Sequence, residues 1–444
     1  MKALVIAAGE GKRFRAGGFK GPKPLYPLLG LSLIERTIFG LREAGVDEIV
    51  LVLGYQQDEI RQYLEERGDL GVKIQVVVHP GWSAGNGTSV LAAQQFLREE
   101  PSFLLTMADH IVSQDVFKQL TANLPGPGEV LVGADFNLAC RPDLREATKI
   151  TVADNNRVVD IGKEIKEFSA VDCGVFHATP ALFAALAEAQ ARGRYTLSDG
   201  IRVLAGRGRA FACSIGDAWW IDVDQPEDAK RARKLLLGQL PSPRDGLVAR
   251  YLNRKLSVPL TGRLAQTGCT PNHVSLFTAF LCALSAVSFV FGSFLWGGLL
   301  AQIASILDGV DGELARLKYL RSHFGELFDS ILDRYSDGVV LIGMAVGTYL
   351  QNSSPWVLVL GAAALLGAPM SMLMKEKFRS ATGRTYLPAE EGPWVNLLLG
   401  NRDGRLFVVM LSGVLHVPLV GLTILALTSH LLVLVRFNLM RRQM

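Results

Sequence analysis

The stretch that decides the fold of the second half of the chain is DGVDGELARLKYLRSHFGELFDSILD, residues 308–333. It places four aspartates, Asp308, Asp311, Asp329 and Asp333, in two consecutive apolar segments. Within each segment the two carboxylates are three or four residues apart, so they share one face of a helix. An aspartate at the centre of a membrane-spanning helix costs about 2.5–3.5 kcal/mol. We therefore expect the four carboxylates to face a polar cavity or to share cations, and four oxygen-donor side chains suit hard cations such as Mg²⁺ or Mn²⁺.

The segments around this stretch are apolar enough to predict a transmembrane domain. Six candidate spans, each near the length that crosses a bilayer, cover 273–294, 296–317, 325–350, 355–374, 404–419 and 420–439. The turns near 295, 351–355 and 416–418 contain no Lys or Arg, whereas the other connections contain several. The positive-inside rule then predicts a multi-pass protein of the cell membrane, with both termini and the acidic motif on the cytoplasmic side.

The first half of the chain has a different pattern. Short apolar runs at 3–8, 49–53, 74–78 and 103–107 alternate with amphipathic stretches, which predicts βαβ units and a mostly parallel sheet. Between the halves lie a Pro- and Gly-containing linker and an amphipathic basic segment, 246–263, which is expected to lie in the membrane interface, with Pro259 bending or ending its helix. The predicted organisation is a Rossmann-like α/β domain, a linker with an interfacial helix, and an all-α six-helix transmembrane domain, over 1–235, 236–270 and 271–444.

Composition excludes several other classes of protein. Hydrophobic residues make up 49% of the chain and charged residues 20%, which argues against intrinsic disorder. The net charge of +4 comes without a Lys/Arg run, so no nucleic-acid partner is expected. The five cysteines are odd in number and form no C-x-x-C, which argues against a disulfide framework or a zinc site.

A glycine turn follows the first apolar run. The turn is AAGEGKRF at 7–14, and GPKPL follows at 21–25. Glycines let backbone N–H groups surround a phosphate, while Arg13 and Lys23 supply positive charge. The turn lacks the G-x-x-x-x-G-K-[ST] pattern, so it is not a P-loop.

Two acidic motifs accompany the turn. Asp109 follows the run 103–107, at the strand end where ligands bind in open α/β sheets. The later motif WIDVDQPED, 220–228, contains Asp222 and Asp224, and the choice between them as a metal ligand stays open.

AAGxGxR followed by PKP resembles the sugar-phosphate nucleotidyltransferases, over about residues 1–230. The resemblance implies that Arg13 and Lys23 stabilise the transferred phosphoryl group. It also implies that Asp109, with Asp224 or Asp222, binds one or two Mg²⁺ or Mn²⁺ ions. The residues that it assigns to nucleotide binding are Ala8, Gly9, Gly11, Gly85, Asn86 and Thr88. The residues that it assigns to the alcohol phosphate are Lys163 and Asp172.

The motif at 308–333 matches the signature of the CDP-alcohol phosphotransferases at every fixed position. This resemblance implies a six-helix membrane enzyme that displaces CMP from a CDP-alcohol, and a homodimer formed through the membrane half. It implies that Asp308, Asp311 and Asp329 hold two divalent cations, and that Asp333 deprotonates the acceptor hydroxyl while also touching a metal. The residues that it places beside the nucleotide are Gly312, Ala315, Arg316 and Gly325.

The order of the two halves resembles the bifunctional inositol-1-phosphate cytidylyltransferase/di-inositol-phosphate phosphate synthases. The resemblance implies that CTP and inositol-1-phosphate give CDP-inositol, whose inositol phosphate then passes to a second inositol-1-phosphate beside membrane lipid. A phosphorylated acceptor needs a basic pocket, for which Lys375, Arg402 and Arg405 are candidates. Their charge is equally explained as a positive-inside topology signal.

Three alternatives stay open. The membrane half could use another CDP-alcohol or a lipid acceptor. The first half could be an inactive regulatory module, although Arg13, Lys23, Asp109 and Asp224 are all in place. The chain could also be a transporter with a nucleotide-sensing domain, although its sequence has no inverted repeat. Two further acidic residues of the motif region, Glu313 and Glu326, are expected on the solvent side of their helices.

Overall fold

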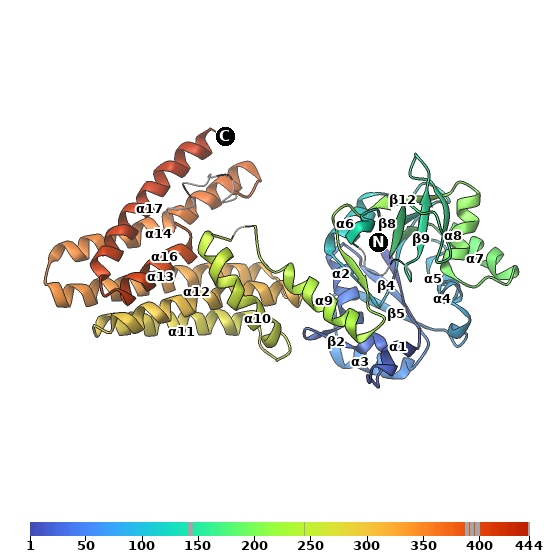
Figure 1. Ribbon diagram of the computed structural model, residues 1–444, viewed down its shortest axis with the longest axis horizontal. Coiled ribbons are helices and arrows are strands. Elements are labelled where there is room, and N and C mark those ends of the chain that lie inside the picture. The colour runs from blue at the N-terminus through green and yellow to red at the C-terminus, as the bar shows by residue number, and fades with distance from the viewer. Residues whose placement is uncertain are drawn as a thin grey trace. The chain divides into compact units, whose positions relative to one another are not determined.

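The computed structural model describes residues 1–140, 144, 146–243, 245–386, 390, 395 and 400–442. The chain divides into two compact units, Met1–Lys234 and Leu235–Met444, each with its own hydrophobic core (Figure 1).

The first unit is built on a nine-stranded mixed sheet, counted over the described residues. Its main path runs β10-β9-β11-β6-β1-β4-β5, and β8 joins β11 to β12. The strands are β1 (Lys2–Ala7), β4 (Glu48–Leu53), β5 (Lys73–Val78), β6 (Phe103–Met107), β8 (Val130–Asp135), β9 (Lys149–Val152), β10 (Val158–Gly162), β11 (Ala170–Ala178) and β12 (Ala210–Ser214). The four apolar runs predicted as strands are confirmed as β1, β4, β5 and β6, which are parallel to one another.

The prediction of a mostly parallel sheet is wrong for the second part of this unit. β11 runs antiparallel to β6, β8 and β9, and β10 runs antiparallel to β9. The connections from β9 to β10 and from β10 to β11 are too short for the helical crossover that parallel neighbours need. These strands therefore turn back on one another.

Helices cover both faces of the sheet (Figure 1). One face carries α2 (Leu33–Glu43), α3 (Gln57–Arg67) and α6 (Gln114–Ala122), and the other carries α4 (Asn86–Ala92), α5 (Gln94–Leu97), α7 (Ala181–Ala191) and α8 (Leu197–Gly206). Successive residues of β1 point to opposite faces, so Val5 packs in one core and Leu4 in the other. This layering leaves the carboxyl edge of the parallel strands free for the site.

Short elements surround that edge. They are α1 (Lys12–Ala16), η1 (Lys23–Leu25), β2 (Pro27–Leu28), β3 (Leu31–Ser32), η2 (Trp82–Ala84), β7 (His110–Val112), η3 (Leu138–Cys140) and β13 (Trp220–Asp222). After them α9 (Pro226–Gly238) carries the chain from the first unit into the second.

The second unit is helical. After η4 (Ala249–Asn253) and α10 (Arg254–Leu264) come α11 (Pro271–Val290), α12 (Phe294–Leu317), α13 (His323–Asn352), α14 (Pro355–Thr382), α16 (Arg402–Val414) and α17 (Pro418–Arg441). Pro259 lies inside α10 and does not end it, because the helix continues to Leu264.

These six long helices lie at the six predicted stretches, but the count of six spans is not confirmed. Among the described residues, α11, α14 and α17 are long and apolar enough to cross a membrane. The acidic motif lowers the apolar character of α12 and α13. At 13 residues α16 spans only about 20 Å, less than the roughly 30 Å of a bilayer core.

Candidate active sites

The first acidic cluster surrounds the ammonium group of Lys23. Its Nζ donates to Asp109 Oδ2 at 2.7 Å and to Asp224 Oδ1 at 2.6 Å, and lies 3.9 Å from Asp222. The side chain of Lys23 is only 6% exposed, so it is a buried cation between three carboxylates. The structure thus brings together the lysine and the three aspartates that the sequence singled out.

Strand pairing places these carboxylates. Asp109 follows β6, at the carboxyl edge of the sheet, and β13 pairs with β7 so that Asp222 lies opposite His110. The backbone N–H of Val223 also donates to Asp109 O at 3.0 Å. The motif that contains Asp222 and Asp224 is thereby held beside Asp109, although it lies about 110 residues further along the chain.

The charges in this cluster shift one another's pKa values. Burial lowers the pKa of Lys23, but Asp109, Asp222 and Asp224 outweigh it and raise the pKa well above its ordinary value. Burial raises the pKa of Asp222 to about 6. The pKa of His110 is lowered by burial, but Asp222 and Asp109 outweigh that effect and raise it to about 9.

His110, which was not among the predicted site residues, lies beside the cluster. Its Nδ1 lies 3.0 Å from Asp109 Oδ1, and its ring stacks on Trp220. One ligand atom each from Asp109, His110 and Asp222 lie within 4.8 Å of one another, an arrangement that could hold a metal ion. Asp222 Oδ1 is buried and accepts no hydrogen bond from the described residues.

The glycine turn packs against this cluster. Gly11 has φ +62°, and a Cβ there would lie 2.8 Å from Lys23 Cβ, so this position needs glycine. Ala8 is buried and Gly9 is exposed directly after β1. Arg13, on α1, forms an ion pair with Glu146 and lies 3.7 Å from Asp224.

The second glycine loop is tied to α8. Asn86 Oδ1 accepts from Leu197 N at 2.8 Å, and Thr88 Oγ1 donates to Gly85 O at 2.7 Å. A Cβ on Gly85, whose φ is +150°, would lie 2.5 Å from Tyr195 O. The side chains of Asn86 and Thr88 thus shape the loop itself.

The two residues assigned to the alcohol phosphate lie in different surroundings. Asp172 is on β11, where its Oδ1 accepts from Gly174 N at 2.7 Å and burial raises its pKa to about 6. Lys163 follows β10 with an exposed side chain that forms no hydrogen bond or ion pair with the described residues. The structure brings Asp172 toward His110, but it leaves Lys163 outside the cluster.

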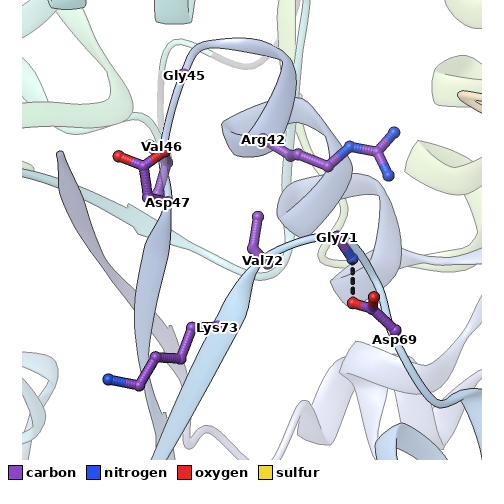
Figure 2. Close-up of a pocket in the computed structure, with 8 residues that line it drawn as sticks. All are labelled: Arg42, Gly45, Val46, Asp47, Asp69, Gly71, Val72 and Lys73. Carbon is purple, nitrogen blue, oxygen red and sulfur yellow. Dashed lines mark hydrogen bonds between the residues drawn. The ribbon is translucent and has the colours of Figure 1, made fainter.

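A surface pocket at the opposite edge of the sheet is a separate feature. Figure 2 shows Arg42, Asp47, Asp69 and Lys73 around the start of β4 and β5, with Gly71 N donating to Asp69. Ligands of open α/β sheets bind outside the carboxyl ends of the strands, whereas this pocket lies at the amino ends. We therefore do not assign it to the nucleotide.

The second acidic cluster joins α12 to α13. Oxygen atoms from Asp308, Asp311 and Asp329 lie within 4.8 Å of one another and could hold a metal ion. Ser275, on α11, donates to Asp311 Oδ2 at 2.7 Å and orients that carboxylate. The structure thus brings together three of the four predicted aspartates, from two neighbouring helices.

Asp333 lies in an ion-pair network rather than in this three-carboxylate group. Arg402 Nη1 lies 2.7 Å from Asp333 Oδ1 and also pairs with Asp308, while its Nε donates to Asp337 at 2.9 Å. Arg405 donates to the other oxygen of Asp337 at 2.6 Å. Two arginines from α16 are thus held among the acidic side chains.

The remaining predicted residues of the membrane half lie on α12, α13 and α14. Gly312 follows Asp311 and its N–H donates to that side chain, while Gly325 N donates to Ser322 Oγ at the start of α13. Ala315 is half-buried on α12, and Arg316 donates to Leu240 O at 2.6 Å. Lys375 Nζ donates to Asn401 Oδ1 at 3.2 Å.

The expectation for Glu313 is wrong. It is completely buried and forms an ion pair with Arg254 and hydrogen bonds with Ser257 and Thr261, which α10 presents from its inner face. No short pattern in the sequence indicates this contact, because it joins two helices about 55 residues apart in the chain. Glu326, by contrast, is exposed as expected.

Comparison with known families gives two matches along the chain. The MobA-like NTP transferase domain matches residues 3–197, and the CDP-alcohol phosphatidyltransferase family matches residues 269–388. The first match contains Lys23 and Asp109, and the second contains the whole acidic motif. The protein is accordingly a transferase with a nucleotidyltransferase domain and a membrane-associated phosphotransferase domain.

Similarity to individual proteins extends over nearly the full length. A bifunctional IPC transferase and DIPP synthase of Rubrobacter xylanophilus is 36% identical over 94% of this chain and 91% of its own. A protein of the same name from Thermococcus kodakarensis is 35% identical over 92% of this chain and 89% of its own. A solved structure, the inositol-1-phosphate CTP transferase from T. maritima, covers 52% of this chain and 94% of its own, with 25% identity and a TM-score of 0.47. From the two full-length relatives it follows that the chain belongs to the family of bifunctional IPC transferases and DIPP synthases.

Proposed function

We propose that this chain catalyses two consecutive reactions. The first unit joins CTP and inositol-1-phosphate into CDP-inositol and releases pyrophosphate. The second unit transfers inositol phosphate from CDP-inositol to another inositol-1-phosphate and releases CMP. The observation that carries the proposal is that one chain, similar end to end to proteins of that double name, holds two separate acidic clusters, each with a cation beside its aspartates.

In the first reaction, a phosphate oxygen of inositol-1-phosphate attacks the α-phosphorus of CTP, and the bond to pyrophosphate breaks. Lys23 and Arg13 offset negative charge as it develops on the transferred group. The backbone after β1, including Gly9 and Gly11, binds the nucleotide phosphates, and the loop from Gly85 contacts the base. Asp172 and Lys163 are the proposed contacts to the alcohol phosphate.

In the second reaction, a hydroxyl of the acceptor attacks the inositol-bearing phosphorus of CDP-inositol, and CMP leaves. Asp333 accepts the hydroxyl proton as general base. Gly312, Ala315 and Gly325 border the nucleotide, because small residues let it approach the backbone closely, and Arg316 supplies a cation for its phosphates. Arg402 and Arg405, with Lys375, bind the acceptor phosphate, for which the guanidinium fork is well suited.

Both clusters fit divalent cations. Asp308, Asp311 and Asp329 offer only oxygen donors, which Mg²⁺ and Mn²⁺ prefer, and Asp222 Oδ1 is buried and receives no hydrogen bond from the part of the chain that the structure describes. We assign two ions to the membrane cluster, and one or two to Asp109 with Asp222, close to Asp224. When bound, such ions neutralise phosphate charge and polarise the reacting phosphorus. His110 is assigned to orient Asp109, since imidazole is a poor partner for Mg²⁺.

The setting of these reactions is also part of the proposal. The apolar helices and the phosphotransferase domain support a membrane protein. We propose that both sites face the cytoplasm, that lipid surrounds the second unit, and that two copies associate through that unit.

Phosphorus NMR of the purified full chain tests this function. With Mg²⁺, CTP and inositol-1-phosphate, pyrophosphate should form first, followed by CMP and a new phosphodiester in equal amounts. Accumulation of CDP-inositol without CMP would overturn the second reaction and point to a different acceptor. Unchanged CTP would overturn the first.

A further inference from the structure

We propose that Glu313 and Arg254 form a positioning pair, through which the amphipathic segment 249–264 sets the orientation of the metal-binding aspartates of α12. The inference deepens the proposed function of the second unit and rests on it. Neither residue belongs to the fixed positions of the acidic motif.

The contacts are dense and buried. Arg254 Nη1 donates to Glu313 Oε1 at 2.6 Å and to the backbone carbonyl of Gly309 at 3.1 Å. Ser257 and Thr261 donate to the two oxygens of Glu313 at 2.6 and 2.5 Å. A carboxylate with no exposed surface and three donors is fully compensated, and losing a donor leaves a buried charge without its partner.

The segment is amphipathic with its polar face turned inward. Asn253, Ser257 and Thr261 are buried and recur every fourth residue, so they form one helical face against α12. Tyr251 and Leu256 are more than half exposed on the outer side. The outer side suits a lipid surface, whereas the inner face is committed to hydrogen bonds with the catalytic helix.

The pair of Arg254 and Glu313 contacts the helical turn of α12 that carries the metal-binding aspartates. Gly309 and Glu313 are four residues apart and share a face of α12, while Asp311 projects from roughly the opposite face at 3.6 residues per turn. Holding the carbonyl of Gly309 and the side chain of Glu313 therefore fixes the rotation of α12 about its axis. That rotation determines whether Asp308 and Asp311 point toward Asp329.

Two further features hold the Arg254 side chain in place. Asp245, at the end of the linker, accepts from Arg254 Nε at 2.7 Å and Nη2 at 2.6 Å, a two-point contact that fixes the guanidinium plane. Gly309 has no side chain, and a Cβ there would lie 2.3 Å from Arg254 Nη1. Glycine at this position is therefore what allows Arg254 to reach the helix backbone.

Gly309→Ala gives a sharp test because it removes no polar group. It displaces Arg254, yet it raises the intrinsic helix propensity of α12. In the full-length protein, both Gly309→Ala and Glu313→Ala should raise the Mg²⁺ concentration for half-maximal CMP release from CDP-inositol by about 10-fold, the effect typical of losing an outer-shell partner. For Glu313→Gln, the Mg²⁺ concentration for half-maximal CMP release should lie between the values of these two variants and that of the unchanged protein. Pyrophosphate release from CTP should not change, which shows that the effect is confined to the second unit.

Arg250→Gln is the matched control, since Arg250 is an exposed cation on the same segment. It should leave the half-saturating Mg²⁺ concentration unchanged. An unaltered Mg²⁺ dependence in Gly309→Ala and Glu313→Ala would overturn the positioning role, even if their maximal rates fall.

Metal binding without turnover separates this inference from the proposed reaction. Mn²⁺ binding is followed by EPR in full-length protein carrying Asp109→Ala, so that the membrane cluster dominates the signal. Glu313→Ala should weaken that binding by about 10-fold. If the chain releases no CMP from CDP-inositol but this weakening is seen, the proposed reaction fails while the positioning role stands. Equal Mn²⁺ affinity with and without Glu313 overturns the positioning role itself.

Discussion

Arg402 on α16 contacts Asp333 on α13 at 2.7 Å, and the same guanidinium pairs with Asp308 on α12. A single cation from outside the acidic motif thus bridges the motif's two helices. The arginine side chain is 10% exposed, so the pairing is screened little by solvent. It explains how several carboxylates can lie close together in this unit.

Replacing this bridge should cost stability. Arg402→Met leaves Asp308, Asp333 and Asp337 without their shared cation, and removing one partner of a buried pair costs about 3–5 kcal/mol. Thermal unfolding of the full chain in EDTA should show the loss. Mg²⁺ should recover part of it, because the ion binds only the folded site. Arg379→Met replaces an exposed arginine of α14 and should change neither the unfolding temperature in EDTA nor that in Mg²⁺. Equal stability of Arg402→Met and the unchanged protein would contradict the bridge.

Asp333→Asn should stop the second reaction alone. The amide cannot accept the hydroxyl proton, and loss of a general base typically lowers a rate by about 10²–10⁴-fold. Phosphorus NMR should show pyrophosphate release from CTP at its usual rate, accumulation of CDP-inositol and little CMP. CMP release at the ordinary rate would remove Asp333 from the reaction.

Gly11→Ala should impair the first reaction alone. The residue has φ +62°, and its new methyl group would lie 2.8 Å from Lys23 Cβ, so the turn or the lysine must move. We expect pyrophosphate release to fall about tenfold or more, since a shift of about 1 Å in a positioning group can cost about 10² in rate. Gly206→Ala is the control, because its new methyl group would meet no atom of the described residues within 4 Å. A Gly11→Ala protein with full CTP turnover would show that Lys23 does not need this turn.

Glu35 gives the first unit a pH-dependent stability. Burial raises the pKa of this carboxyl, but hydrogen bonds from Ser32 and Tyr63 and the charge of Arg67 outweigh it and hold the pKa below its ordinary value. A depressed folded pKa contributes stability above the unfolded pKa, about 4.3, and that contribution is lost as pH falls through the folded value.

Glu35→Gln should therefore destabilise the chain by about 1–3 kcal/mol at pH 7, and the difference should shrink below about pH 4. Thermal unfolding over a pH series measures it. Glu65→Gln, on the exposed side of α3, should have no such pH-dependent effect. If the difference in free energy of unfolding between Glu35→Gln and the unchanged protein stayed constant at low pH, the carboxylate charge would not be its cause.

Much of both sites was predictable because local motifs bring their own residues together. The spacing of Asp308 and Asp311 fixes a shared helical face, and Asp109 follows a recognisable buried strand. The direct contact between Lys23 and Asp109 was not predicted, because the resemblance assigned Lys23 to a phosphoryl group and Asp109 to a metal ion.

The remainder depends on tertiary contacts that no short pattern encodes. Arg402 and Asp333 are far apart in sequence and meet only because α16 packs on α12 and α17. Glu313 is buried because α10 turns its polar face toward α12. A surface helix usually turns its polar face toward solvent instead. Lys163 follows β10, which is an end strand of the sheet and is separated from β6 by β9 and β11.

Mixing two single variants of the full chain tests the central claim most directly. Asp109→Ala alone should leave CTP unchanged, and Asp333→Asn alone should stop at CDP-inositol and pyrophosphate. With CTP, inositol-1-phosphate and Mg²⁺, the mixture should restore CMP and the phosphodiester in phosphorus NMR, because CDP-inositol can diffuse from one protein to the other. A complete reaction by either variant alone, or no phosphodiester from the mixture, would contradict two consecutive sites in one chain.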